Sequence, residues 1–272
     1  MSGSDRTILK VENIGIEFSG ITAVRDVSFE VKYGEVFTLI GPNGAGKTTV
    51  FNLISRVYSP SWGSVRFDGH LLNALPAHRL AGLGLARTFQ NIELFEHASV
   101  IENLLIGRHA HRQSTFFADA LHLKQVRRGE IASRSRCEEI LEFLGLQKYR
   151  ESIVASLPYG IKKVVELARA LCTGPKLLLL DEPSSGLNGQ ETSRMAEWIE
   201  AIRDSGVTIL IVEHDMGLVS KVSDRVLAMN QGEMVTVGRA ADVQAHAQVV
   251  EAYLGTSEDA TSLRRSRGRE LQ

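Results

Sequence analysis

The sequence predicts an α/β protein with a mostly parallel central sheet, an N-terminal antiparallel β subdomain and an inserted helical subdomain. Two unbroken apolar runs, Leu177–Leu180 and Val207–Val212, are typical of strands covered on both faces. Between them, Gln190–Asp204 has apolar residues at helical spacing, which completes a strand–helix–strand unit. Apolar residues also recur at helical spacing from Val100 to Leu144, where no strand pattern appears, so this region predicts the inserted subdomain.

Local patterns predict the other elements. Ile8–Phe18 and Ala23–Val31 are rich in strand-forming residues around a turn that contains glycine, and they predict an antiparallel pair. Glu35–Ile40 is a short apolar segment that leads directly into a glycine-rich loop. The sequence also predicts a strand at Ser64–Phe67 with a turn at Asp68-Gly69, a short helix at Pro76–Ala81, a strand at Gly84–Thr88, and a final hairpin of Val226–Met229 and Met234–Val237.

The composition fits a protein with a sizeable buried core. The chain has 272 residues, of which 43% are hydrophobic and 23% charged, and its net charge is −1. This balance argues against general disorder and against global attraction to nucleic acid, so we expect no nucleic-acid partner. Two cysteines form no disulfide framework, and no charge-free apolar run approaches about 18 residues. Met1 to Lys10 is polar, so we expect no secretory signal and a cytoplasmic protein.

A nucleotide-binding motif follows the strand expected at Glu35–Ile40. The segment Gly41-Pro-Asn-Gly-Ala-Gly-Lys-Thr-Thr49 matches the pattern G-x-x-x-x-G-K-[ST], with a helix expected from Thr48 onward. Glycines let the backbone wrap closely around phosphates, and the N–H groups of the loop and of the helix start then face the anion. The residues expected to bind nucleotide here are Asn43, Gly44, Ala45, Gly46, Lys47, Thr48 and Thr49, with the Thr48 hydroxyl as a ligand of Mg²⁺. This motif predicts a P-loop NTPase core and makes ATP and Mg²⁺ the expected cofactors.

Three polar residues at strand ends complete the expected chemistry. Asp181 ends a buried apolar run, which is the position of a carboxylate that holds hydrated Mg²⁺. Glu182 follows it and is the candidate general base. His214 follows the second run and becomes a candidate contact to the γ-phosphate.

The order of these motifs resembles the ATP-binding cassette (ABC) family over nearly all of residues 8–255. Gln90, in Thr88-Phe-Gln, looks like the Q-loop glutamine of the family, which contacts Mg²⁺ and takes part in catalysis. Leu157-Pro-Tyr-Gly-Ile161 occupies the place of the family's signature sequence, so the resemblance implies nucleotide contacts by Tyr159 and Gly160. Ser184–Asn188 matches the D-loop. Phe18 is similar to the aromatic residue that stacks on adenine, although an aromatic strand residue also serves as simple packing.

Finer features resemble the ATP-binding subunits of importers for branched-chain or other hydrophobic amino acids. They are Arg87-Thr-Phe-Gln-Asn91, Val100-Ile-Glu-Asn-Leu104, Tyr159-Gly160, Val212-Glu-His-Asp-Met216 and Glu251-Ala-Tyr-Leu-Gly255. The resemblance implies an ATPase that powers import at the cytoplasmic face of the cell membrane. It also implies a second ATP-binding subunit, transmembrane permease subunits and, indirectly, a solute-binding protein as partners. Alternatives are a lipopolysaccharide-type export cassette, a soluble ABC ATPase without a transport role, and a regulator that does not hydrolyse ATP.

The signature departs from the family's common Leu-Ser-Gly-Gly-Gln. Pro158 replaces the serine, which removes one hydroxyl donor to phosphate, and Ile161 replaces the glutamine. Pro158 suits a helix start because its missing N–H needs no partner there. Lys162 and Lys163 follow near the positive end of that helix. We expect either that an ATP phosphate or an acidic partner offsets their charge, or that both are solvated.

The resemblance implies one ABC domain over residues 1–255, with the helical subdomain at about 95–172. Residues 256–272 carry four arginines among Ser and Gly and predict a disordered basic tail. Residues 108–136 hold seven Lys and Arg against two Asp and Glu, a local net charge of +5. This insert is either a solvated face or a contact to lipid headgroups or a membrane subunit.

Overall fold

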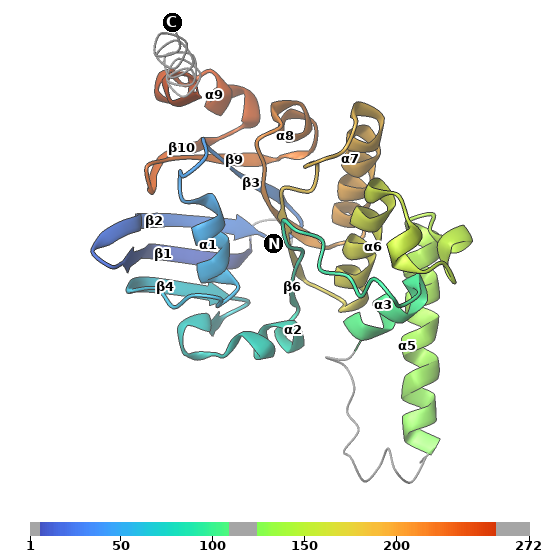
Figure 1. Ribbon diagram of the computed structural model, residues 1–272. Coiled ribbons are helices and arrows are strands. Elements are labelled where there is room, and N and C mark those ends of the chain that lie inside the picture. Colours follow the sequence, from blue (N-terminus) through green and yellow to red (C-terminus); the bar gives the residue numbers. More distant parts are fainter. Residues whose placement is uncertain (1–5, 109–123, 254–272) are drawn as a thin grey trace, which may run out of the picture. The chain divides into compact units, whose positions relative to one another are not determined.

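The structure is a computed structural model that describes residues 6–108 and 124–253, without the side chains of 124–128 (Figure 1). It divides into two compact units. Unit 1 comprises Met1–Leu75 and Leu210–Gln272, and unit 2 comprises Pro76–Ile209. The tail expected at 256–272 and most of the basic insert at 108–136 lie outside the described residues. Within the described ranges, no helix combines the length and the apolar character needed to cross a bilayer.

Unit 1 begins with a four-stranded sheet in the order β2-β1-β4-β5. These strands are β1 (Thr7–Phe18), β2 (Ile21–Lys32), β4 (Trp62–Phe67) and β5 (His70–Leu71), followed by the 3₁₀ turn η2 (Leu72–Ala74). β1 pairs antiparallel with both β2 and β4, so that Leu9 lies opposite Val31 on one side and Phe67 on the other. All three side chains are buried, which gives this sheet one apolar face. The predicted antiparallel pair and the strand with its turn at 64–69 are confirmed.

The second sheet of unit 1 follows the order β10-β9-β3-β8. Its elements are β3 (Val36–Ile40), β8 (Thr208–Val212), β9 (Arg225–Asn230) and β10 (Glu233–Gly238), with the helices α1 (Lys47–Ile54), α8 (Met216–Val222) and α9 (Ala240–Gln244) and helical residues 247–253. β3 runs parallel to β9, and every residue of β3 is buried. The division between the units falls inside β8, between Ile209 and Leu210. The predicted final hairpin is confirmed as β9 and β10, which pair antiparallel.

Unit 2 holds two parallel strands and most of the helices. They are η3 (Ala77–Arg79), α2 (Leu80–Leu83), β6 (Leu85–Arg87), α3 (Val100–Gly107), α5 (Lys124–Phe143), η5 (Gln147–Tyr149), η6 (Val154–Ser156), α6 (Tyr159–Cys172), β7 (Leu177–Asp181) and α7 (Gly189–Asp204). β6 and β7 pair in parallel, with Arg87 opposite Leu179. α3 packs against α6 and α5. The helices expected within 100–144 and at 190–204 are confirmed.

Side-chain caps fix the starts of two helices in unit 2. Ser99 and Glu102 form a reciprocal capping box at α3, and Asn188 and Glu191 form another at α7. The short helix expected at Pro76–Ala81 is a 3₁₀ turn that continues into α2. Pro76 has an extended backbone before that turn, because proline cannot donate the hydrogen bond of a helix interior.

Candidate functional site

The loop between β3 and α1 in unit 1 has the backbone of an anion site. Gly44 and Gly46 have φ of +82° and +95°, in the left-handed region that favours glycine. Gly46 is the N-cap of α1, and no side chain caps this helix. The first N–H groups of α1 are therefore available to a phosphate, and the helix dipole favours negative charge at the same place.

Lys47 is buried inside this loop. Its Nζ donates to the carbonyl of Gly41 at 2.6 Å and to that of Pro42 at 2.9 Å. The ammonium group is thus held by the loop that would surround a phosphate. Asn43, Gly44 and Thr48 are exposed, Thr49 is partly exposed and Ala45 is buried, so the loop presents its middle and the Thr48 hydroxyl at the surface.

His214 lies just after β8 in the same unit. Glu213 holds the turn, because its buried carboxylate accepts from the backbone N–H of His214 at 2.7 Å and of Asp215 at 3.1 Å. Asp215 then caps α8 through its own side chain. The imidazole of His214 is 55% exposed, with Nδ1 3.6 Å from a Glu213 oxygen. The turn therefore fixes the backbone of His214 and leaves its ring accessible.

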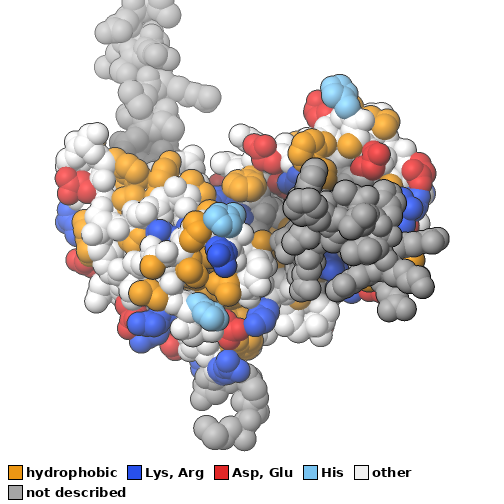
Figure 2. All heavy atoms as spheres, turned by 90° about the horizontal axis from the view of Figure 1, so that it is seen from below, with side chains coloured by type: hydrophobic (Ala, Val, Ile, Leu, Met, Phe, Trp, Pro, Cys, Tyr) orange, Lys and Arg blue, Asp and Glu red, His pale blue; other side chains and the backbone are white. Residues whose placement is uncertain are grey.

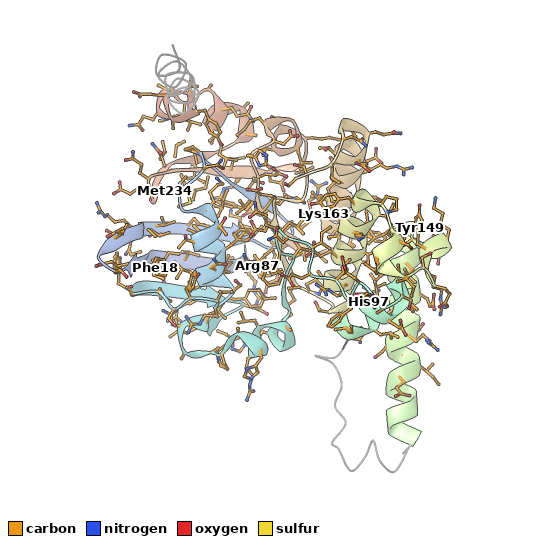
Figure 3. All side chains as sticks on the ribbon, viewed as in Figure 1. Phe18, Arg87, His97, Tyr149, Lys163 and Met234 are labelled. Carbon is orange, nitrogen blue, oxygen red and sulfur yellow. The ribbon has the colours of Figure 1, made fainter. Side chains whose placement is uncertain are left out.

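Asp181 ends β7 in unit 2 and is almost fully buried, at 1% exposure. Arg87, on the neighbouring strand β6 and labelled in Figure 3, contacts Asp181 Oδ2 through Nη2; the distance between these atoms is 2.8 Å. Asp181 Oδ1 is buried and accepts no hydrogen bond from any described residue. One carboxylate oxygen is fixed by an arginine, and the other keeps its lone pairs for a cation.

Glu182 and Gln90 lie together in unit 2. Gln90 Nε2 donates to Glu182 Oε2 at 3.0 Å. Glu182 has a left-handed backbone, with φ of +47°, which is uncommon for a residue with a side chain. Such strained positions concentrate at functional sites. The two residues expected to act beside Asp181 are therefore in direct contact with each other.

Sequence and structure comparisons identify the same protein family for this chain. Residues 24–185 match the family model described as "ABC transporter". The chain belongs to the ABC transporter family. It is 38% identical, over 92% of its length and 98% of the relative, to the high-affinity branched-chain amino acid transport ATP-binding protein BraF of Pseudomonas aeruginosa. It is 31% identical, over 91% of its length and 97% of the relative, to the lipopolysaccharide export system ATP-binding protein LptB of Escherichia coli.

Solved ABC cassettes share the fold. The ADP conformation of an ATP-binding cassette of an ABC transporter superposes with a TM-score of 0.81 at 31% identity, covering 92% of this chain and 99% of that one. The family membership confirms the P-loop NTPase core and the α/β fold class that the sequence predicts.

The segment expected to be the signature, Leu157–Ile161, leads into the start of α6. Pro158 is the N-cap, and the first helical hydrogen bond runs from Lys162 N to Pro158 O at 3.0 Å. The N–H groups of Gly160 and Ile161 therefore have no partner within the helix. Tyr159 is 45% exposed, and a Cβ on Gly186 would lie 2.7 Å from its ring, so the ring packs directly on the D-loop glycine.

The expectation that both lysines of α6 are solvated is wrong for Lys163. Its side chain is 4% exposed, and its Nζ donates to the Gln90 carbonyl at 3.1 Å. Lys162 Nζ lies 3.8 Å from a carboxylate oxygen of Glu96, its neighbour in the same unit. Helical spacing alone did not show this, because the partners come from a segment about 70 residues earlier in the chain.

Phe18, the candidate for adenine stacking, is the last residue of β1 in unit 1 (Figure 3). Its ring is 41% exposed and packs edge-to-face on Tyr58 at 5.2 Å between centroids. Other exposed hydrophobic residues of unit 1 include Ile21, Val57, Trp62 and Leu71. Hydrophobic side chains among basic and histidine side chains are also visible on the face in Figure 2. Phe18 is thus partly exposed and packs against a second aromatic residue.

Sequence reasoning assigned no role to Arg87, Glu213 or Tyr58. For Arg87 a signal was present, because it ends a short strand immediately before Thr88-Phe-Gln90. The chemistry of both units suits a magnesium nucleotide. In unit 1, backbone N–H groups, the Lys47 ammonium and the Thr48 hydroxyl suit phosphate. In unit 2, the Asp181 oxygen without a hydrogen-bond partner suits a hard cation such as Mg²⁺.

Proposed function

We propose that this chain is the ATP-binding and ATP-hydrolysing subunit of an ABC importer for branched-chain or other hydrophobic amino acids or related small solutes. The observation that carries the proposal is the buried Asp181, whose Oδ2 is held by Arg87 and whose Oδ1 has no hydrogen-bond partner among the described residues. Glu182, in contact with Gln90, follows it directly. A phosphate loop with a buried lysine accompanies it in the same chain. BraF, similar over nearly the whole length, is named for branched-chain amino acid transport.

Residue roles follow from the donor chemistry. Backbone N–H groups of Asn43, Gly44, Ala45 and Gly46, with Lys47, Thr48 and Thr49, bind the phosphates. Thr48, Gln90 and Asp181 would hold Mg²⁺, and the ion would neutralise charge that develops on the phosphates. Phe18 stacks on the base, and His214 contacts the γ-phosphate.

Glu182 is the general base. Its carboxylate accepts a proton from the attacking water as the water oxygen forms its bond to the γ-phosphorus and the bond from that phosphorus to the bridging oxygen of ADP breaks, so that ADP leaves with the electron pair. Gln90 Nε2 holds one carboxylate oxygen of Glu182 in place. Tyr159 and Gly160, at the start of α6, offer N–H groups to the nucleotide held by a second subunit.

The partners are a second ATP-binding subunit, identical or related, and transmembrane permease subunits, with a solute-binding protein acting through the permeases. This places the chain at the cytoplasmic face of the cell membrane. The higher identity to BraF than to LptB supports import rather than lipopolysaccharide export.

Glu182→Gln tests the assignment of hydrolysis. ATP turnover should fall about 10²–10⁴-fold because the general base is lost, while ATP binding persists. Glu197→Gln, on an exposed face of α7, is the matched control and should hydrolyse ATP as the wild type does. Wild-type turnover in Glu182→Gln would refute the assignment.

Uptake tests the transport role. Liposomes that contain this chain, its permeases and the second ATP-binding subunit should accumulate a branched-chain amino acid when ATP is enclosed with the ATP-binding subunits and the solute-binding protein is supplied outside. Incorporating Glu182→Gln should abolish accumulation. Unchanged uptake with Glu182→Gln would contradict the proposal. So would a lack of uptake of every hydrophobic amino acid by the wild-type transporter.

A further inference from the structure

Three ionisable side chains lie one turn apart on the face of α6 that points away from solvent. They are Lys163, Glu166 and Arg169, and the first two are only 4% and 2% exposed. Charged side chains are almost never buried to this extent unless they are paired, because burial removes their hydration. Their partners therefore show what this face of the helix does.

All three side chains bind the backbone of one segment, Phe89–Glu93, which follows β6. Lys163 Nζ donates to the Gln90 carbonyl at 3.1 Å, and Arg169 Nη1 donates to the Glu93 carbonyl. Glu166 Oε1 accepts from the N–H of Phe89 at 3.2 Å, and the backbone of Glu93 also hydrogen-bonds to this carboxylate. Along about two turns of this helix, a donor (Lys163), an acceptor (Glu166) and a second donor (Arg169) follow one another.

The middle member is stabilised by the outer two. The positive charges of Lys163 and Arg169 both favour the ionised form of Glu166, whereas burial disfavours it and raises its pKa. Charge-assisted hydrogen bonds of this kind are stronger than neutral ones. Lys163, on α6, is labelled in Figure 3.

Gln90 is held through both its backbone carbonyl and its side-chain amide. Its carbonyl accepts from Lys163, and its side-chain amide donates to Glu182. The helix that supplies Lys163 begins at Tyr159 and Gly160, the signature residues. A displacement of α6 would therefore carry the backbone of Gln90 with it.

We propose that Lys163, Glu166 and Arg169 are positioning residues that fasten the segment Phe89–Glu93 to α6, so that the helix which starts at the signature places Gln90. The inference rests on the proposed role of Gln90 in holding Mg²⁺, but the fastening itself does not depend on nucleotide.

Amide hydrogen exchange of the full chain without nucleotide tests the fastening. In Glu166→Leu, the peptide that spans Phe89–Glu93 should exchange about tenfold faster, as expected when a hydrogen bond to a charged group is lost. Glu166→Gln keeps an acceptor and should stay within about threefold of the wild type. Unchanged exchange in a folded Glu166→Leu variant overturns the proposal. If that variant does not fold, the exchange of the same peptide is measured in Lys163→Met, and an unchanged rate there overturns the proposal.

The magnesium dependence of turnover tests the positioning. At saturating ATP, Lys163→Met should need about tenfold more Mg²⁺ for half-maximal turnover, and Lys163→Arg should restore the wild-type value because it keeps a charged donor. Lys148→Met, an exposed lysine of the same unit, is the control and should match the wild type.

The two tests separate the possible failures. A wild-type magnesium requirement in Lys163→Met, with turnover intact in the wild-type protein, overturns the positioning role alone. An absence of turnover in the wild-type protein refutes the proposed function, and the exchange measurement then still decides whether α6 holds the segment.

Discussion

The buried pair of Arg87 and Asp181 leads to the sharpest stability prediction. Their side chains are 7% and 1% exposed, and Nη2 lies 2.8 Å from Oδ2. Replacing Arg87 by Met leaves the carboxylate of Asp181 buried without its counter-charge, since Oδ1 already has no hydrogen-bond partner among the described residues. Breaking a buried ion pair in this way costs about 3–5 kcal/mol. Because 1 kcal/mol lowers the melting temperature of a domain of this size by about 2–4 °C, we expect a fall of roughly 10 °C.

Thermal unfolding followed by circular dichroism measures this loss. Arg150→Met is the matched control, because its pair with Glu138 lies at the surface of the same unit, and it should lower the melting temperature several-fold less. The double variant Arg87→Met/Asp181→Leu removes both charges and should recover most of the stability that Arg87→Met loses. The reasoning is refuted if Arg87→Met melts within about 2 °C of the wild type, or if the double variant is less stable than Arg87→Met.

Three further predictions concern capping, pH and base recognition. Ser99→Ala removes the capping box of α3 and should cost about 1 kcal/mol in urea unfolding, whereas an unchanged midpoint would show that the cap contributes nothing. Burial raises the pKa of Glu166 above its ordinary 4.5, so its contribution to stability is full below that value and is lost as pH rises through the higher folded pKa. Melting curves of Glu166→Gln should lack this fall, and identical pH profiles for the two proteins would count against it. Phe18→Ala should weaken ATP binding about three- to tenfold in calorimetry and leave inorganic triphosphate binding unchanged; equal losses for both ligands would exclude base stacking.

Local sequence was sufficient for the elements that carry the phosphate chemistry. The motif from Gly41 to Thr49 specifies its own loop because glycines at 44 and 46 permit the left-handed backbone found there. The apolar run of β7 likewise predicts that Asp181 emerges at the end of a buried strand. In both cases the determinants are contiguous in sequence, so their geometry follows from a short segment.

Contacts between distant segments were not predictable in the same way. Arg87 meets Asp181 only because β6 pairs with β7 in one register, which no pattern within either segment specifies. The charge of Lys163 and Glu166 gives no sign in sequence that they are buried, since charge usually marks the exposed face of an amphipathic helix. Their burial depends on the backbone of Phe89–Glu93, whose polar groups need partners once they are covered.

Equilibrium binding of MgATP to the purified chain tests the central claim most directly. Isothermal titration should show saturable binding at or below about 1 mM for the wild type, the usual range for enzymes that use such substrates. Lys47→Ala should lose most of this affinity because the buried ammonium is the loop's only side-chain charge, while Lys221→Ala, an exposed lysine of α8, should bind as the wild type does. The absence of MgATP binding in the wild type, or equal affinities in wild type and Lys47→Ala, would contradict the account.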